Sequence, residues 1–313
     1  FMREASKRKA RASERERDYI EAYEHRYAEG VDPQRARQNF ERAMERIIVK
    51  YPDDIEAKAL YADATMGGNR VGTELLIRQI LAVDPNHPGA HHYRIHNWDD
   101  EDGAQALESC GRYGLLAPAI GHALHMPGHI YAGLGMYHEA AISLESATRA
   151  EIGYMGRQMV FPYNTWNYAH NRNYLSYVQE QLGLPSEAIR GARELLAVPL
   201  DVKLNDATRF SPHWQGVSAL TRALVKFERW DEILKPGSIP WGTSLRDRLL
   251  RSYAEALAKM GKGDPGAESA VRQFTSLKSE IDKPENASFA LQYEVPSLEL
   301  RAALALKQGA APK

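Results

Sequence analysis

Two pairs of histidines in this chain share one spacing, His92 with His96 and His125 with His129. On a helix, residues four positions apart lie on the same face, about one turn from each other, so the two imidazoles of a pair can reach one metal ion. The pairs themselves are 33 residues apart (125 less 92), which is the period of a helix-turn-helix repeat. Stacked repeats would therefore bring both pairs to one metal site.

The elements that must position these histidines are helices. Apolar residues recur with helical spacing between Gly and Pro breakers at 51–54, 84–88 and 183–185, and convincing β alternation appears nowhere. The expected helices are Glu14–Glu29, Gln34–Lys50, Ile55–Thr65, Arg70–Ala82, His91–Trp98, Ala104–Tyr113, His122–Leu134, Tyr137–Ala150, Asn167–Leu182, Ser186–Val198, Trp214–Glu228, Leu245–Met260 and Ala267–Ile281.

Internal repetition predicts one solenoid domain, in which helix pairs stack on their neighbours. A shift of 33 residues superposes like residues at several places: Pro52, Pro85 and Pro118, and Ala57, Ala90 and Ala123. Two longer connections, Glu151–Trp166 and Pro199–Pro212, are expected as insertions. The domain spans 1–313 and comprises N-terminal repeats (12–83), histidine-bearing repeats (84–198) and C-terminal repeats (199–313).

The segment Gly121–Ala150 resembles a tetratricopeptide repeat. In that family the first helix of a repeat carries a large, a small and an aromatic residue, and a turn glycine and two alanines follow. The small residues let the two helices approach closely. The residues at these places are Leu124, Gly128, Tyr131, Gly135, Ala140 and Ala147. The resemblance implies an all-α, tetratricopeptide-like α-solenoid of antiparallel helix pairs with a concave groove.

In the tetratricopeptide pattern, the second, fifth, ninth and twelfth residues of the first helix face the concave groove. The residues at such places are His122, His125 and His129 in one repeat, His92, His96 and Asp99 in the repeat before it, and His170 and Asn173 in the repeat after it. A metal-free polar groove and simple packing of the imidazoles remain as alternatives. The metal ligands that we predict are His92, His96, His125, His129 and Asp99.

The sequence does not choose among zinc, copper, iron, manganese and nickel, all of which suit a site of three or four histidines with a carboxylate. If only three histidines bind, one position stays open for water or substrate. His122 and His170 are then candidates for a fourth ligand or a general base, and we take them as the catalytic residues. Asp99 could instead accept a hydrogen bond from a ligating histidine and fix its tautomer. Asp63, one repeat before His96, is a weaker ligand candidate.

Four further residues are candidates for holding a substrate. Tyr163 and Trp166 lie in the first insertion, where aromatic rings could form a wall over the groove or simply pack the insertion down. Arg222 could hold an anionic substrate group, or its side chain could simply be solvated. Asn173 takes a groove-facing place in the helix that carries His170.

The histidine blocks extend the resemblance. The runs 86–96 and 122–131 look like a large bacterial group of tetratricopeptide-repeat proteins that carries HPGA-x-HYYIHA followed by H-x-x-HMP-x-HIY at this separation. A third block of that group resembles 168–171, although Asn173 stands where the group usually has another histidine. The resemblance covers 12–232 and implies a histidine-lined groove, but the group has no agreed activity.

Two functions fit these residues. As an enzyme, the protein would use a divalent transition metal to generate hydroxide for hydrolysis or to carry out oxygen chemistry, on a small molecule or peptide in the groove. As a non-catalytic scaffold, it would hold a peptide or a protein partner there. No nucleophile elbow, phosphate loop or dinucleotide fingerprint occurs in the sequence, so any chemistry must come from the histidines and a metal.

The composition of the chain argues against nucleic acid and membranes as partners. The formal net charge is −1, which recruits neither nucleic acid nor an anionic membrane. No apolar run of about 18 residues occurs, so we expect a soluble protein without a membrane span. Cys110 is the single cysteine, which excludes an intramolecular disulfide framework and leaves bacterial cytoplasm and periplasm equally open.

Overall fold

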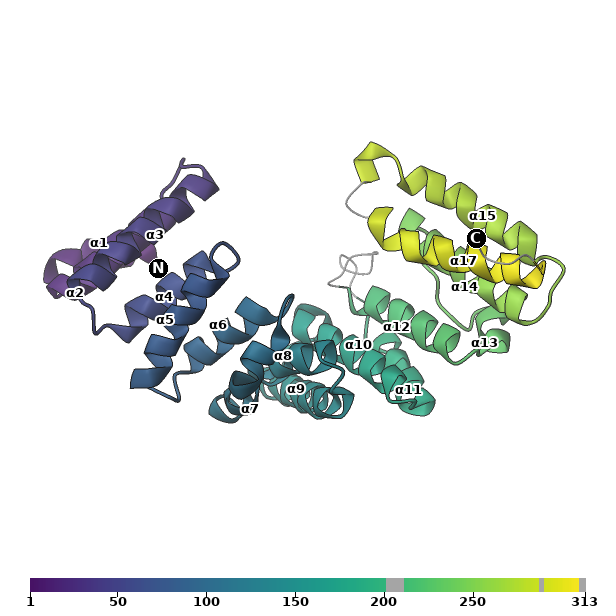
Figure 1. The fold of residues 1–313 in the computed structure, drawn as a ribbon, viewed down its shortest axis with the longest axis horizontal. Coiled ribbons are helices and arrows are strands. Elements are labelled where there is room, and N and C mark those ends of the chain that lie inside the picture. Colours follow the sequence, from purple (N-terminus) through teal and green to yellow (C-terminus); the bar gives the residue numbers. More distant parts are fainter. Residues whose placement is uncertain (201–210, 287–289, 310–313) are drawn as a thin grey trace. The chain divides into compact units, whose positions relative to one another are not determined.

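The computed structural model describes residues 1–200, 211–286 and 290–309, and these residues form helices joined by turns (Figure 1). No β-strand occurs in this described part of the chain. The all-α prediction is confirmed, and neighbouring helices pack in pairs along the chain, which is consistent with an α-solenoid. The chain divides into two compact units: Phe1–Ala119 with Ala123–Met136, and Ile120–His122 with Tyr137–Lys313.

The first unit contains the N-terminal helices, and from α2 to α7 each helix packs against the next one along the chain. Two 3-10 turns, Lys9–Arg11 and Gly103–Ala106, connect them. The helices are α1 (Met2–Arg8), α2 (Glu14–Arg26), α3 (Pro33–Lys50), α4 (Ile55–Thr65), α5 (Arg70–Val83), α6 (Pro88–Trp98), α7 (Leu107–Leu116) and, apart from its first two residues, α8 (Gly121–Gly133).

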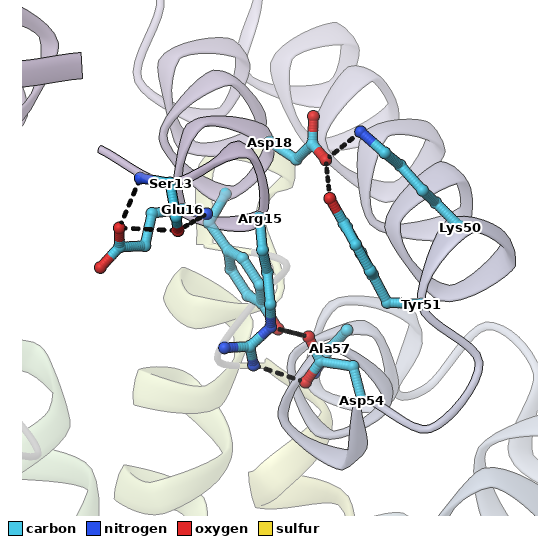
Figure 2. Close-up of polar contacts among 9 residues, drawn as sticks. Ser13, Arg15, Glu16, Asp18, Lys50, Tyr51, Asp54 and Ala57 are labelled. Carbon is cyan, nitrogen blue, oxygen red and sulfur yellow. Dashed lines mark hydrogen bonds and ion pairs between the residues drawn. The ribbon is translucent and has the colours of Figure 1, made fainter. Parts of the chain in front are cut away.

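Helix α2 begins with a capping box and is tied to α4 (Figure 2). The Ser13 hydroxyl accepts the Glu16 backbone N–H at 3.3 Å, and the Glu16 carboxylate accepts the Ser13 N–H at 2.8 Å, which satisfies two free donors of the helix start. Arg15 donates two hydrogen bonds to Asp54, at 2.6 and 2.8 Å. Asp54 also accepts the Ala57 N–H and so caps α4.

The core of this unit fixes the helices that carry the histidine pairs. Helices α6, α7 and α8 share one cluster of buried side chains: Ile95, Ala106, Cys110, Tyr113, Ala123, Met126 and Ile130. Because a packed interior tolerates little displacement, the face of each helix that does not enter this cluster has a defined direction.

The second unit continues the helical array, and from α9 to α15 each helix packs against the next. Its two largest clusters of buried apolar residues lie around α11, α12 and α14, and around α14, α15 and α17. The helices are α9 (Tyr137–Gln158), α10 (Trp166–Gln181), α11 (Pro185–Leu196), α12 (Pro212–Lys226), α13 (Trp230–Leu234), α14 (Leu245–Gly261), α15 (Ala267–Ile281) and α17 (Glu294–Lys307).

The conformation of two turns agrees with the predicted repeat pattern. Gly135, between α8 and α9, has a φ of +74°, and Gly183, between α10 and α11, has a φ of +71°. A side chain would be strained in this left-handed conformation, which explains a glycine at the end of each first helix. Ala140, Ala147 and Ala188 are fully buried in the second helices. These places agree with the repeat pattern, while the tetratricopeptide type itself stays a prediction.

The first insertion begins later than we predicted. Helix α9 continues through Ala150 to Gln158, so the expected helix end was wrong, and part of Glu151–Trp166 is helical. No proline occurs between Tyr137 and Pro162, and the helix ends where Met159 adopts a positive φ of 54°. Helices α1, α13 and α17 were also missed. Most of the second expected insertion, 199–212, lies outside the described residues.

Candidate metal centre

The first histidine pair lies on α6. His87 caps this helix, because its Nδ1 accepts the Ala90 backbone N–H at 3.0 Å, and Pro88 occupies the first turn, where its missing N–H costs no helical bond. From this start, His92 and His96 fall on one face, with ring centroids 4.7 Å apart. His92 is half-buried and His96 is exposed, so the pair is accessible to a ligand.

Neighbouring side chains fix the direction of this pair. His91 is 1% exposed, and its ring nitrogens lie 2.9 Å from the Ser109 hydroxyl and 3.0 Å from the Pro85 carbonyl. His91 therefore lies on the packing side of its helix. On the other side, the ring of Tyr113 from α7 stacks on His92, with centroids 5.2 Å apart and planes 16° apart. Sequence reasoning missed Tyr113, because it has no special spacing to the histidines.

The second pair lies on α8, with ring centroids 5.2 Å apart. His125 is buried and His129 is half-buried. Pro127 stands between them inside the helix and has no N–H for the Ala123 carbonyl, so one internal hydrogen bond of α8 is missing there. Met126 anchors this stretch in the core that α8 shares with α6 and α7. Packing of α8 against α6 and α7 therefore holds this pair at the point where a backbone hydrogen bond of α8 is missing.

His170 on α10 lies close to two aromatic rings, Trp166 at 5.8 Å and Tyr174 at 6.0 Å between centroids. Burial lowers the pKa of His170, and the neighbouring His122 lowers this pKa further. His96 is exposed by surface area, but partial desolvation by the surrounding protein also lowers its pKa. Both shifts favour the neutral imidazole, the form in which a ring nitrogen keeps a lone pair for a metal.

The histidines form two groups of three, which we call the first and second histidine groups. Each residue offers one ring nitrogen, and the nitrogens of a group lie within 4.8 Å of one another. Tetrahedral coordination at about 2.0–2.1 Å would place them about 3.4 Å apart, which small side-chain rotations can reach. The groups are His92, His96 and His122, and His125, His129 and His170. Either group could hold a metal ion.

This grouping differs from the arrangement expected from the sequence, in which both pairs share one ion. Each pair is instead brought together with a third histidine, His122 for the pair on α6 and His170 for the pair on α8. The two residues that we predicted as catalytic therefore lie among the candidate ligands. A general-base role for either of them stays a prediction, as do the ligand roles of the four paired histidines.

Asp99 lies beside the second group. Its Oδ2 is 3.6 Å from His129 Nδ1, which is an ion-pair distance and slightly too long for a hydrogen bond. Burial, together with the charge of Asp100, raises the pKa of Asp99 to about 6. The carboxyl is thus placed to influence which His129 nitrogen carries the proton. Whether Asp99 binds the metal directly stays a prediction.

The two aromatic candidates differ in their surroundings. Trp166 is 49% exposed and lies next to His170 of the second group. Tyr163 belongs to the 3-10 turn Pro162–Asn164 and stacks on Phe161, with centroids 5.3 Å apart. Of the two, the structure brings only Trp166 to a histidine of the candidate site among the described ring contacts, while a substrate role for either stays a prediction.

Arg222 and Asn173 bind each other and a buried acid. The Arg222 guanidinium donates to both Glu180 carboxylate oxygens at 2.9 Å, to Asn173 Oδ1 at 3.1 Å and to the Asn173 carbonyl at 3.2 Å. Glu180 is 2% exposed, and a buried carboxylate requires such a partner. Sequence reasoning missed Glu180. The predicted substrate contacts of Arg222 and Asn173 stay untested.

A second acid missed in the sequence lies at the start of α8. Glu151 on α9 is 8% exposed, accepts a hydrogen bond from Asn167 Nδ2 at 2.7 Å, and approaches Gly121 so closely that a Cβ there would lie 2.2 Å from its Oε1. A carboxylate at a helix N-terminus is electrostatically favourable. Gly121 directly precedes His122, so this contact helps to place a ligand candidate of the first group.

In comparisons with known proteins, no family model, curated protein or solved structure matches the chain. The resemblance to the bacterial tetratricopeptide-repeat group therefore rests on the sequence blocks alone. Among the helices of the described chain, none has the length and apolarity that crossing a membrane requires.

Proposed function

We propose that this protein binds two metal ions, one in each histidine group, and that it is a metal-dependent enzyme, hydrolytic or oxidative. Its substrate would be a small molecule or peptide held in the concave groove of a tetratricopeptide-like solenoid. The observation that carries the proposal is the meeting of three ring nitrogens within 4.8 Å in each group. Three protein ligands and one open position are the usual arrangement of a catalytic zinc site.

The electrostatics of the groups support metal binding over simple packing. Desolvation lowers the pKa values of His96 and His170, so protonation of these two rings is disfavoured. The ring nitrogens of each group lie close enough together to reach one divalent cation. His125, which is 2% exposed, and the half-buried His129 would be shielded from competing water.

The chemistry would follow from the open coordination position. A metal ion held by the three imidazoles of a group would supply an activated water for the hydrolysis of an ester, amide or phosphate bond. Iron or copper in the same ligand set would instead support oxygen chemistry. In either case the residues of this chain would hold the ion and bind the substrate beside it.

The test is elemental analysis of the full chain, purified without an affinity tag and then equilibrated with zinc, manganese, iron or copper. We expect two equivalents of metal in the wild type, one in His92→Ala, one in His129→Ala and none in the double variant His92→Ala with His125→Ala. His138→Ala is the matched control, because His138 is exposed on α9, and it should retain both ions. A metal-free wild type, or equal loss in His138→Ala, would refute the proposal.

The catalytic part of the proposal has its own test. Metal-loaded protein should hydrolyse at least one ester, amide or phosphodiester probe, or consume oxygen with a small organic substrate, and a chelator should remove the activity. Protein that retains both ions but turns over none of these probes would contradict the enzyme and favour the scaffold that holds a peptide or protein partner.

A further inference from the structure

A polar cavity of about 410 Å³ lies within the first unit and reaches the first histidine group. It opens among α2, α3, α4 and the adjoining ends of α5 and α6. A volume of several hundred Å³ is typical of a site for a small organic molecule. Its charged and titratable lining residues are Arg26, Arg37, Arg70, Asp63, Asp100 and His96. We call it the arginine cavity.

Two of the three arginines are held in place by the protein. Arg37 and Arg70 each donate to a backbone carbonyl at 2.5 Å, and each also meets one carboxylate, Glu41 at 2.9 Å and Glu101 at 3.3 Å. The backbone bonds fix each guanidinium in place, and the carboxylate beside it offsets part of its charge. Because these side chains are already ordered, a ligand that binds them loses less conformational entropy.

Arg26 and Asp63 are different, because neither has a hydrogen bond or an ion pair with any residue in the described ranges. The Arg26 guanidinium lies 5.9 Å from the Tyr27 ring. Burial raises the pKa of Asp63, and the charges of Arg37 and Arg26 partly offset this rise. The guanidinium groups of Arg26 and Arg37 are therefore close enough to Asp63 to affect its pKa. The N–H donors of Arg26 form no hydrogen bond within the described ranges and can bind another molecule.

We propose that the arginine cavity binds a small molecule through an oxyanion, either a carboxylate or a phosphate, held by Arg26 and Arg37. The planar guanidinium fork matches two oxygens of such a group at once. Arg37 and Arg70 each have a carboxylate partner, Glu41 and Glu101, whereas Arg26 forms no ion pair in the described ranges, so Arg26 supplies the positive charge that an oxyanion would meet. The rest of the molecule would extend toward His96.

This inference extends the proposed function, since it would place the anionic end of the substrate beside the first histidine group. Binding of the oxyanion itself requires no metal, because none of the arginines belongs to a histidine group. The two proposals can therefore fail separately.

The experiment is calorimetric titration of metal-free, full-length protein with two probes, inorganic phosphate and glutarate. We expect saturable binding of one equivalent of at least one probe. Binding of phosphate alone identifies a phosphate ligand, and binding of glutarate alone identifies a carboxylate. If neither probe binds saturably, the proposal is overturned.

Three variants locate the binding. Arg26→Gln should weaken it about tenfold, the effect of losing one charge-assisted hydrogen-bond partner, and Asp63→Asn should strengthen it, because a repelling charge is removed. Arg42→Gln, on the exposed side of α3 and outside the cavity lining, is the control and should change affinity less than about twofold. Equal effects of Arg26→Gln and Arg42→Gln would overturn the proposal.

Metal content, measured on the same samples after loading, separates the two proposals. Arg26→Gln should bind as much metal as the wild type. Oxyanion binding in a protein that takes up no metal would reject the metal proposal alone, whereas normal metal content without oxyanion binding would reject the arginine cavity alone.

Discussion

Helices α10 and α15 of the second unit bury faces of opposite character. The buried face of α10, which carries His170, is largely polar, whereas that of α15 is apolar except for one lysine. The polar residues buried on α10 are Asn167, Asn171, Arg172, Ser176, Gln179 and Glu180. The apolar residues buried on α15 are Ala267, Ala270, Val271, Phe274, Leu277 and Ile281.

The polar buried face of α10 contributes less to the stability of the fold than the apolar buried face of α15. Burying apolar side chains is the main stabilising contribution to a fold, whereas a buried polar atom without a partner costs about 1–3 kcal/mol. Asn171 is fully buried, and neither atom of its amide group has a hydrogen-bond partner among the described residues. We infer that α10 is shaped to position His170 and its neighbours, and that α15 is shaped to hold the fold together.

The largest effect is expected in the apolar region. Phe274→Ala removes a side chain that is 1% exposed at the centre of the cluster around α14, α15 and α17. We expect the free energy of unfolding to fall by about 3–5 kcal/mol, while metal content per folded molecule stays unchanged. Urea unfolding measures this, with exposed Val295→Ala as the control. A loss below about 1 kcal/mol would show that α15 does not stabilise the fold as described.

A substitution at the start of α8 should act on the site instead. Gly121→Ala brings a Cβ within 2.2 Å of Glu151 Oε1, so the carboxylate and the start of the helix must shift next to His122. We expect zinc affinity at the first histidine group to fall about 10- to 100-fold, as for other residues that support a ligand, with the second group unaffected. Gly133→Ala on the same helix meets no atom within 4 Å and is the control. Titration with zinc that gives equal affinities for both variants would contradict this account.

Replacing the unpartnered amide should make the polar helix more stable. Asn171→Leu keeps the number and branching of the side-chain heavy atoms and removes the buried donor and acceptor, so the metal-free protein should gain about 1–2 kcal/mol in free energy of unfolding. Asn173→Leu, two residues along, should have the opposite sign, because Asn173 accepts a hydrogen bond from Arg222. Thermal and urea unfolding of both variants tests this pair. Destabilisation by Asn171→Leu would mean that its amide has a role in holding α10.

The smallest effect is expected at the N-terminal end and depends on pH. Burial alone would raise the pKa of Asp54, but hydrogen bonds from Arg15, Tyr19 and the Ala57 N–H outweigh it and lower this pKa. Because the folded-state pKa lies below the ordinary value of about 3.9, the stabilisation is present above that pH and is lost as pH falls through the folded pKa. Asp54→Asn should therefore lower the free energy of unfolding by about 1 kcal/mol at pH 7.

That difference should shrink in urea unfolding at low pH, where the wild-type carboxylate becomes protonated. Asp53→Asn changes an exposed neighbour of the same type and should have little effect at either pH. A loss in Asp54→Asn that is the same at both pH values would show that the charge of Asp54 does not contribute.

Helix positions were largely readable from the sequence, because their ends have local causes. The predicted bounds Ile55–Thr65 and Ala267–Ile281 agree with α4 and α15. For α4, the Asp54 side chain that caps the helix lies directly before it and follows a proline. The separation of His91 from His92 was also readable, because adjacent residues of a helix point about 100° apart and only one of them can face the core.

The membership of each histidine group was not readable in the same way. Spacing along one helix pairs His92 with His96, but which third histidine completes a group depends on how separate helices pack. The arginine cavity was missed for the same reason, since Arg26, Arg37 and Arg70 come from three helices and share no repeated spacing. Local signals define elements, and long-range packing defines sites.

Anomalous X-ray diffraction from crystals of the zinc-loaded protein, recorded on both sides of the zinc absorption edge, tests the central claim most directly. The account predicts two peaks, each about 2.0–2.1 Å from three imidazole nitrogens, one among His92, His96 and His122 and one among His125, His129 and His170. Crystals in which neither group has a peak, or in which the rings of a group point away from one another, would contradict it.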